Sequence, residues 1–194
     1  MERMAHELHI TGDADADALL SSDPLALLVG MLLDQQVPME TAFAGPAKLQ
    51  ARLGSFDAAT IADYEPEAFV EVMKQSPAVH RFPGSMAGRV QGLCAAVVAD
   101  WAGRAENIWT RGEPDGAEIL TRLNSLPGFG EQKSKIFLAL LGKRQGLTAA
   151  GWEAAAGAYG EKGSYRSVAD IVDPESLLSV RATKQAAKAA AKKA

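Results

Sequence analysis

Apolar residues recur at helical spacing along most of the chain, and no segment alternates apolar and polar residues as a half-buried strand does. Asp23 and Pro24 form a strong helix start, an N-cap followed by a first-turn proline. The helix predicted after them is almost entirely apolar, with Leu25, Leu28, Val29, Leu32 and Leu33. A helix that is apolar all round belongs at the buried centre of a fold. The pattern therefore predicts an all-α protein built around this helix.

Further helices are predicted on both sides of this central one. Pro38 restarts the chain into a helix over residues 39–43, which Gly45 and Pro46 interrupt. The other predicted elements are short helices over 57–62 and 66–73, a long helix from Ser85 to Trp101, an Ala-rich helix over 152–159, a capping box over 167–170 and a last helix that starts at Asp173.

Two helices that span residues 119–142 are predicted to form a hairpin around the sequence Leu-Pro-Gly-Phe-Gly at 126–130. Proline blocks a further helical turn, and the glycines permit backbone angles that side chains forbid. Gly130 then opens a helix whose free amides can bind a phosphate. Lys133 and Lys135 gain nothing from the helix dipole in the first turns, so we expect them to point outward, toward an anion. The alternative is an ordinary αα-hairpin with a Gly-rich turn.

The chain carries a formal charge of −4, with 20 basic and 24 acidic residues. Five of the basic residues and none of the acidic ones follow Val180, which leaves 15 against 24, or −9, for residues 1–180. We expect one unit over 1–180 and a basic Ala/Lys tail over 181–194. Lys184, Lys188 and Lys192 share one helical face, which predicts either phosphate binding or a solvated terminus. Because residues 1–180 are acidic overall, any surface on them that binds nucleic acid must be a local patch of positive charge.

The sequence also bears on the compartment. No run of 18 apolar residues exists, so no membrane partner is expected. Residues 1–6 lack the pattern of a secretory signal. A single cysteine, Cys94, excludes an internal disulfide and suits a reducing environment. We expect a cytoplasmic protein, associated with the nucleoid if it binds DNA.

The segment from Leu126 to Gly130 resembles the helix-hairpin-helix element of the HhH-GPD superfamily of base-excision DNA glycosylases. Asp34-Gln35-Gln36, after the central helix, resembles the Gln-bearing loop of the 3-methyladenine glycosylases and of endonuclease III. The resemblance covers roughly residues 23–146. It implies a two-lobed HhH-GPD-like fold that binds double-stranded DNA with a damaged base. It also implies DNA contacts from the hairpin and the glutamine loop, namely Leu126, Gly128, Phe129, Gly130, Gln132, Lys133, Lys135, Gln35 and Gln36. For the two glutamines the alternative is a buried side-chain amide that joins two helices.

The same resemblance bears on cofactors and on lyase activity. Family members often hold a monovalent cation at the hairpin, and some carry a four-cysteine iron–sulfur cluster that a single cysteine excludes; no other cofactor and no metal site is expected. Bifunctional members have a lysine two residues past the last hairpin glycine, where this chain has Gln132. Lys133 is rotated from that place by about 100° on the helix. The resemblance therefore implies a monofunctional glycosylase, if the protein is an enzyme.

The resemblance also implies a catalytic carboxylate close to the bond that the enzyme cuts. Where the family has an aspartate, this chain has Ala150 and Gly151, and Glu153 is the single acid nearby. Glu153 is our first candidate and Asp34 the second. The alternatives are that Glu153 lies on a helix surface and that Asp34 hydrogen-bonds a loop backbone. A glycosylase-like scaffold that binds damaged DNA without cutting it is the rival function, and a protein-interaction domain with an incidental hairpin is a third.

Four residues are candidates for a base pocket. His80 and Arg81 lie beside Phe82 in a loop bounded by prolines, where they combine a proton donor, a cation and a stacking face. Trp152 and Tyr159 could stack on a base. The alternatives are an exposed polar loop for the first pair and aromatic cover of the core for the second.

Overall fold

The computed structural model describes residues 7–194, in which eleven α-helices and two short 3-10 helices occur and no strand does. The all-α prediction is confirmed for this part of the chain, and the prediction about residues 1–6 lies outside it. The α-helices are α1 (Ala14–Ser22), α2 (Pro24–Leu33), α3 (Met39–Leu53), α4 (Ala58–Asp63), α5 (Pro66–Lys74), α6 (Pro83–Trp101), α7 (Asn107–Thr110), α8 (Gly116–Asn124), α9 (Glu131–Arg144), α10 (Trp152–Ala156) and α11 (Pro174–Lys193).

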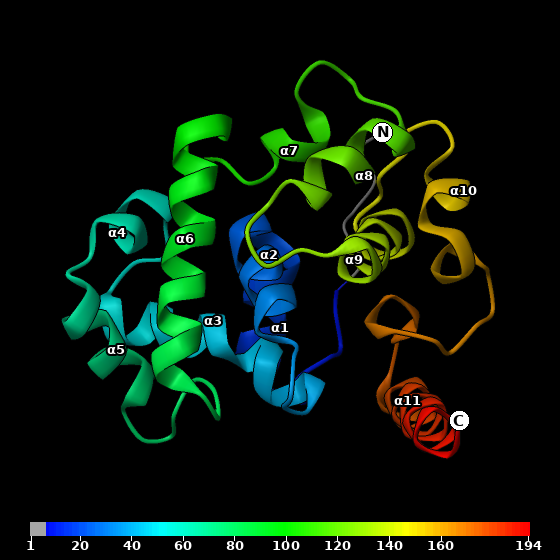
Figure 1. Cartoon of the computed structure of the whole chain (residues 1–194), viewed down its shortest axis with the longest axis horizontal. Helices are drawn as coiled ribbons and strands as arrows, with labels where there is room; N and C mark the ends of the chain where they lie inside the picture. The colour runs from blue at the N-terminus through cyan, green and yellow to red at the C-terminus, as the bar shows by residue number, and fades with distance from the viewer. Residues whose placement is uncertain (1–6) are drawn as a thin grey trace.

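Helix α2 lies at the centre, between α6 and α9 (Figure 1). Every residue from Leu25 to Leu33 is buried, as its uniformly apolar sequence predicts. The carboxylate of Asp23 caps the helix by accepting hydrogen bonds from the amides of Leu25 and Ala26, at 2.9 and 3.3 Å. The predicted start and the buried position of this helix are both confirmed.

Helix α3 does not stop at Gly45 and Pro46, as the sequence analysis expected, but continues through them to Leu53. Both residues are buried against the core. A Cβ atom at Gly45 would lie 2.6 Å from a side-chain carbon of Leu33, so glycine permits close packing of α3 on α2. The burial of this face outweighs the missing proline amide, because tertiary packing supplies most of the stability of a protein helix.

Helices α4, α5 and α6 form one side of the molecule (Figure 1). The side-chain nitrogen Nε2 of Gln91 on α6 donates to the backbone carbonyl groups of Ile61 and Tyr64, and so connects α6 to the end of α4. Helix α6 starts at Pro83, two residues before the predicted start at Ser85, since proline is favoured in a first helical turn.

The hairpin helices α8 and α9 form the other side together with α10, 3-10 helices over Gly157–Gly160 and Val168–Asp170, and α11. The predicted capping box at Ser167 is present. Helix α11 runs without a break across residue 180, the boundary expected for the tail. Among residues 7–194 no single helix is long and apolar enough to cross a membrane, and the one pair that passes on length and composition, α1 with α2, is bent by 114°.

Candidate functional site

The turn of the hairpin packs against the end of α2. Gly128 has a φ angle of +82°, and a Cβ atom there would lie 2.4 Å from a methyl carbon of Leu32. Both facts require glycine at this position. Gly130 has an ordinary φ angle of −81° and open space around its Cα atom. The Ser134 amide is the first of α9 to donate within the helix, to the Gly130 carbonyl, so the amides before it face the turn.

Leu126 and Phe129 anchor this turn in the core. Their exposed fractions are 5% and 4%, and the Phe129 ring meets Phe137 edge-on at a centroid distance of 6.2 Å. Their side chains therefore cannot touch a ligand outside the protein. Any contact that these two residues make with DNA must come from the backbone.

The expectation that Lys133 points outward is wrong. Its Nζ atom donates to the carbonyl groups of Met31, Leu32 and Asp34, at 2.7, 3.2 and 3.3 Å. The C-terminal end of a helix carries unpaired carbonyls and partial negative charge, so the end of α2 attracts this cation. Burial lowers the pKa of Lys133 to about 8, although the nearby Asp34 carboxylate opposes the shift. Lys133 thus joins the hairpin helix to the end of the central helix.

Lys135 and Gln132 have different surroundings. Lys135 forms an ion pair with Glu131 at 2.8 Å on the surface of α9. Gln132 is exposed, and its side-chain amide donates to the Tyr159 hydroxyl at 2.9 Å. This bond brings together two residues that the sequence analysis assigned to different parts of the site, the hairpin and the base pocket.

Gln132 and Tyr159 line a cavity of about 340 Å³, which we call the Asp34 cavity. Its walls come from the residue that caps the end of α2, the first turns of α9, the 3-10 helix Gly157–Gly160, residues 166–168 before α11 and one face of α11. Its lining comprises Asp34, Gln132, Ile136, Ala158, Tyr159, Arg166, Ser167, Val168, Thr183, Lys184, Ala187 and Lys188.

Asp34 is a buried carboxylate in the wall of this cavity. Its side chain is 8% exposed, and the Lys184 ammonium lies 3.8 Å from its Oδ2 atom. Burial raises the pKa of Asp34, while the positive charges of Lys184 and Lys133 act in the opposite direction. An ionised carboxylate in this position can stabilise positive charge on a bound group, and the two nearby cations reduce that effect.

Glu153 and Trp152 lie elsewhere. Glu153 is exposed, and it lines neither the Asp34 cavity nor the second cavity described below. The Trp152 ring packs on the last turns of α9, where a Cβ atom at Gly142 would come within 2.5 Å of three ring atoms. These placements match the alternatives considered for the two residues, a helix-surface acid and an aromatic cover of the core. Of the two candidate carboxylates, Asp34 is the one that is buried and lines a cavity.

The glutamine loop is fixed by hydrogen bonds at Gln35 and is exposed at Gln36. The Gln35 side chain donates to the Leu32 carbonyl at 2.9 Å and accepts a hydrogen bond from Arg89 of α6 at 3.0 Å. Gln35 therefore joins the end of α2 to α6, which is the alternative to a DNA contact that the sequence left open for this residue. Gln36 has a φ angle of +58°, rare for a residue with a side chain, and it projects into a second cavity.

His80 supports this loop rather than an external ligand. It is 1% exposed, and its Nδ1 atom accepts from the Phe82 amide at 3.0 Å. The proton must then be on Nε2, which lies 2.9 Å from the Gln35 carbonyl and donates to it. His80 therefore neither faces a base pocket, as the sequence led us to expect, nor belongs to an exposed polar loop, because it is buried and both ring nitrogens are bonded within the protein.

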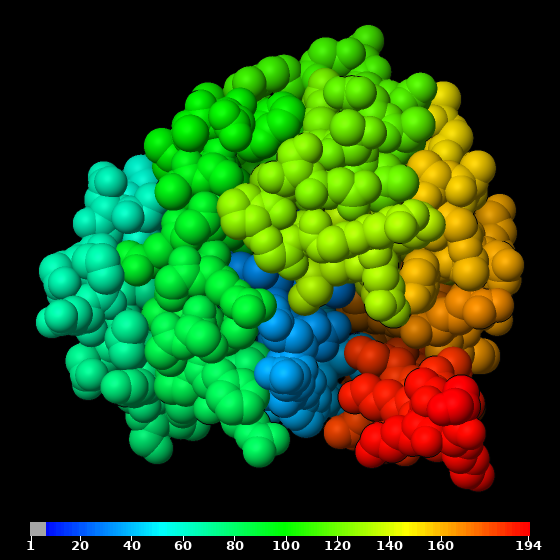
Figure 2. Space-filling view, in the orientation of Figure 1, coloured from blue at the N-terminus to red at the C-terminus, as the bar shows by residue number. Residues whose placement is uncertain are grey.

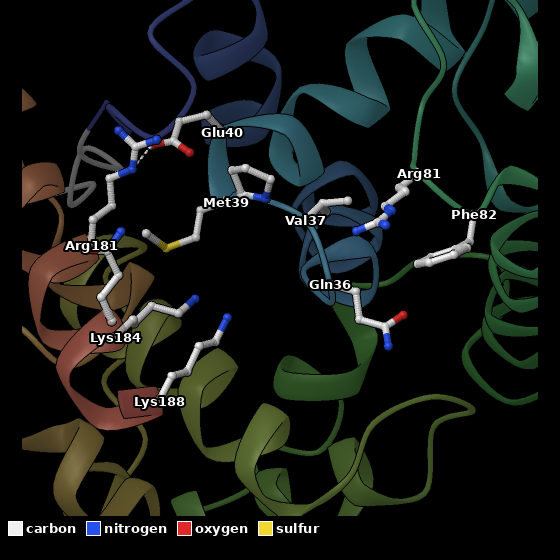
Figure 3. A pocket seen from close by; sticks show the side chains of 11 residues that line it. Gln36, Val37, Met39, Glu40, Arg81, Phe82, Arg181, Lys184 and Lys188 are labelled. Carbon is white, nitrogen blue, oxygen red and sulfur yellow. Dashed lines mark ion pairs between the residues drawn. The ribbon is translucent and has the colours of Figure 1, made fainter. Parts of the chain in front are cut away.

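Arg81 and Phe82 are exposed, and the Arg81 guanidinium lies over the Phe82 ring at 5.3 Å from its centroid. Both face the second cavity, of about 510 Å³, which we call the α11 cavity (Figure 3). Its lining comprises Gln36, Val37, Pro38, Met39, Glu40, Arg81, Phe82, Arg181, Lys184, Gln185 and Lys188.

Helix α11 forms a wall of both cavities, which was not expected from the sequence. The signal was present in the spacing of Lys184 and Lys188 on one helical face, but the sequence could not show what that face meets. Arg181 fixes the helix through an ion pair with Glu40 of α3 at 3.0 Å. The space-filling view shows the last part of α11 in red as a projection at the edge of the molecule, below the hairpin helices (Figure 2).

Residues 7–194 contain no group of three or more His, Cys, Asp or Glu side chains arranged to hold a metal ion. Comparison of the whole chain with protein-family models, curated proteins and solved structures gives no match.

Proposed function

We propose that this protein is a DNA glycosylase-like repair protein of the HhH-GPD type, which binds damaged double-stranded DNA through its hairpin and hydrolyses the bond between sugar and base. The observation that carries the proposal is the position of Asp34, a buried carboxylate in the wall of a cavity that begins at the first turn of α9, next to the hairpin. The resemblance of residues 126–130 to the family hairpin supplies the substrate class.

The geometry of the hairpin supports a phosphate contact. The exposed backbone at Gly128 and Gly130 and the free amides at the start of α9 provide donors without base identity. The buried side chains of Leu126 and Phe129 hold this backbone in place. A rigid turn loses little conformational freedom when it binds, which favours its use as a grip.

The Asp34 cavity supports base excision. A damaged base must leave the stack to be excised, and the cavity's volume lies within the range of sites that enclose one small ligand. The bond between C1′ and the base nitrogen breaks with its electron pair leaving on the base, and C1′ acquires positive charge. The Asp34 carboxylate stabilises that charge. Water then bonds to C1′ and loses a proton, and the departing base takes up a proton.

The surroundings of Lys133 support a monofunctional enzyme. Its amine donates to three carbonyl groups at the end of α2, so it is not directed into the Asp34 cavity, which it does not line. Gln132, at the position of the family lysine, cannot form a Schiff base. Excision should therefore leave an intact abasic strand, and borohydride should trap no covalent adduct of protein and DNA.

The decisive experiment compares Asp34→Asn with Glu153→Gln on duplexes that carry a panel of damaged bases. Each change removes one negative charge with almost no change in shape. We expect Asp34→Asn to lower the excision rate by about 100- to 1000-fold while it retains DNA affinity. Glu153→Gln should match the wild type. Loss of excision in Glu153→Gln alone would move the catalytic role back to Glu153.

A second test addresses the hairpin. Gly130→Val should weaken binding to all DNA sequences alike, because a side chain there shields amides that contact phosphate. The open space around Gly130 means that the fold should tolerate this change, whereas Gly128 has no room for a side chain. Unchanged DNA affinity in a folded Gly130→Val variant would show that the hairpin is not the element that contacts the DNA phosphates.

One observation favours the rival function, a damaged-DNA-binding module without catalysis. Lys184 forms an ion pair with Asp34, so a cation already partly neutralises the charge that catalysis would use. Tight binding to one damaged duplex, without excision across the whole panel, would support that function. In that case Asp34→Asn should change neither affinity nor the abundance of abasic strand.

A further inference from the structure

The α11 cavity concentrates positive charge on an otherwise acidic protein. Three of its cations, Arg181, Lys184 and Lys188, extend from α11, and Arg81 faces them from the opposite wall (Figure 3). The chain as a whole carries a charge of −4. Glu40 is the one acidic residue among the residues that line this cavity. Such a local excess of cations favours an anionic ligand.

Two of these four cations are committed to ion pairs within the protein. Arg181 pairs with Glu40 at 3.0 Å, and Lys184 pairs with Asp34 at 3.8 Å. Among residues 7–194 neither Arg81 nor Lys188 forms an ion pair. The two come from segments more than a hundred residues apart in sequence, and they line one cavity. Cations on opposed walls can each contact a phosphate oxygen of an anionic ligand that lies in the cavity.

The cavity also has an apolar part. Phe82 is 41% exposed at one wall, and Val37 and Met39 also line the cavity. A cation-lined groove with an exposed aromatic face is the combination that binds unpaired nucleotides, through phosphate on the cations and a base on the ring. A cavity of about 510 Å³ encloses one small ligand and cannot enclose a duplex.

We propose that the α11 cavity binds a phosphate and base of an unpaired DNA strand, with Arg81 and Lys188 as the principal phosphate contacts. This inference rests on the proposed function, which makes DNA the source of the nucleotide. Lys184 lines both cavities, so the strand held here continues toward the Asp34 cavity. Helix α11 then forms a wall of the binding site. The lysines of the tail that line the cavity should contribute more to DNA affinity than those that do not.

The test uses that difference within one helix. The variant Lys184→Gln/Lys188→Gln removes two cations that line the cavity, and Lys192→Gln/Lys193→Gln removes two that do not. Both pairs change the net charge equally and preserve helix propensity. The affinity of the full chain for a short labelled single-stranded oligonucleotide is measured by fluorescence anisotropy between about 50 and 200 mM salt.

We expect the cavity pair to flatten the log–log salt dependence by about 0.7 for each phosphate that the variant no longer neutralises, and the control pair to leave it unchanged. Arg81→Gln, on the opposite wall, should reduce the slope by the amount that corresponds to one phosphate. Phe82→Leu should weaken binding by about fivefold to a hundredfold, because leucine cannot stack on a base. Circular dichroism checks that each variant is folded.

Two results would overturn the inference. Equal effects of the two lysine pairs, with no effect of Arg81→Gln, would show a solvated tail that binds DNA without the cavity. Displacement of the oligonucleotide by a free deoxynucleoside monophosphate at equal concentration would assign the cavity to a free nucleotide. Because binding is measured without excision, either failure is distinct from a failure of the glycosylase proposal, which the Asp34→Asn experiment decides.

Discussion

Removing the charge of Asp170 should destabilise the protein strongly. The Asp170 side chain is 4% exposed and lies 2.6 Å from the Nζ atom of Lys143, which is itself 9% exposed. The other carboxylate oxygen accepts hydrogen bonds from the Ser164 hydroxyl and from the amides of Arg166 and Ser167. This carboxylate therefore fixes the segment that carries three residues of the Asp34 cavity, Arg166, Ser167 and Val168.

The magnitude follows from the burial of both charges. Breaking a buried ion pair from one side costs about 3–5 kcal/mol, because the remaining charge is left without its partner. In Asp170→Asn, Lys143 retains one acceptor, the Glu161 carbonyl at 2.6 Å, so we expect a loss near the lower end of that range. For a protein of this size, each kcal/mol lowers the melting temperature by about 2–4 °C. The melting temperature should then fall by about 6–12 °C.

The assay is urea unfolding of the wild type, Asp170→Asn, Lys143→Met and the double variant. The double variant should be more stable than the sum of the two single losses predicts, by about 0.5–3 kcal/mol, because no unpaired buried charge remains. Glu71→Gln is the control, since Glu71 and Lys74 form a pair whose side chains are 73% and 53% exposed. It should change stability by less than about 0.5 kcal/mol. Strictly additive single losses, or a loss under about 1 kcal/mol in Asp170→Asn, would refute this reasoning.

Three further predictions concern pH, packing and reactivity. Burial lowers the pKa of Lys133 from 10.5 to about 8, so between pH 8 and 10.5 the unfolded chain binds more protons than the folded one, and the free energy of unfolding rises with pH. Over this window the wild type should gain up to about 3 kcal/mol of stability relative to Lys133→Met, and a difference in urea unfolding that does not change with pH would contradict the lowered pKa. Gly142→Ala should cost about 1–3 kcal/mol because the added carbon meets the Trp152 ring, whereas Gly88→Ala on α6, with nothing within 4 Å, should stabilise by about 0.5–1 kcal/mol in the same assay. Burial raises the pKa of the Cys94 thiol to about 12, so a thiol reagent at neutral pH should label this residue only after the protein unfolds, and rapid labelling of the native protein would contradict its placement.

Local features of the site could be predicted from the sequence, whereas side-chain positions that depend on distant segments could not. The periodic pattern and the hairpin turn are local, so they identified the helices on either side of residues 126–130 and the free amides at Gly130. The direction of Lys133 depends on the carbonyl groups of α2, about a hundred residues earlier in the chain. Which of the two candidate carboxylates is buried, Asp34 or Glu153, likewise depends on how the helices pack, and no local pattern contains that information.

The sequence by itself determined the all-α class, the uniformly buried central helix, and the caps at Asp23, Ser167 and Asp173, because each depends on residues within a few positions of one another. Only the tertiary structure decided that α3 continues through Pro46, since that outcome depends on the close approach of Gly45 to Leu33. It also decided that α11 and Arg81 face each other across one cavity. Packing between distant segments fixes such meetings, and packing energy exceeds the local preferences that a sequence displays.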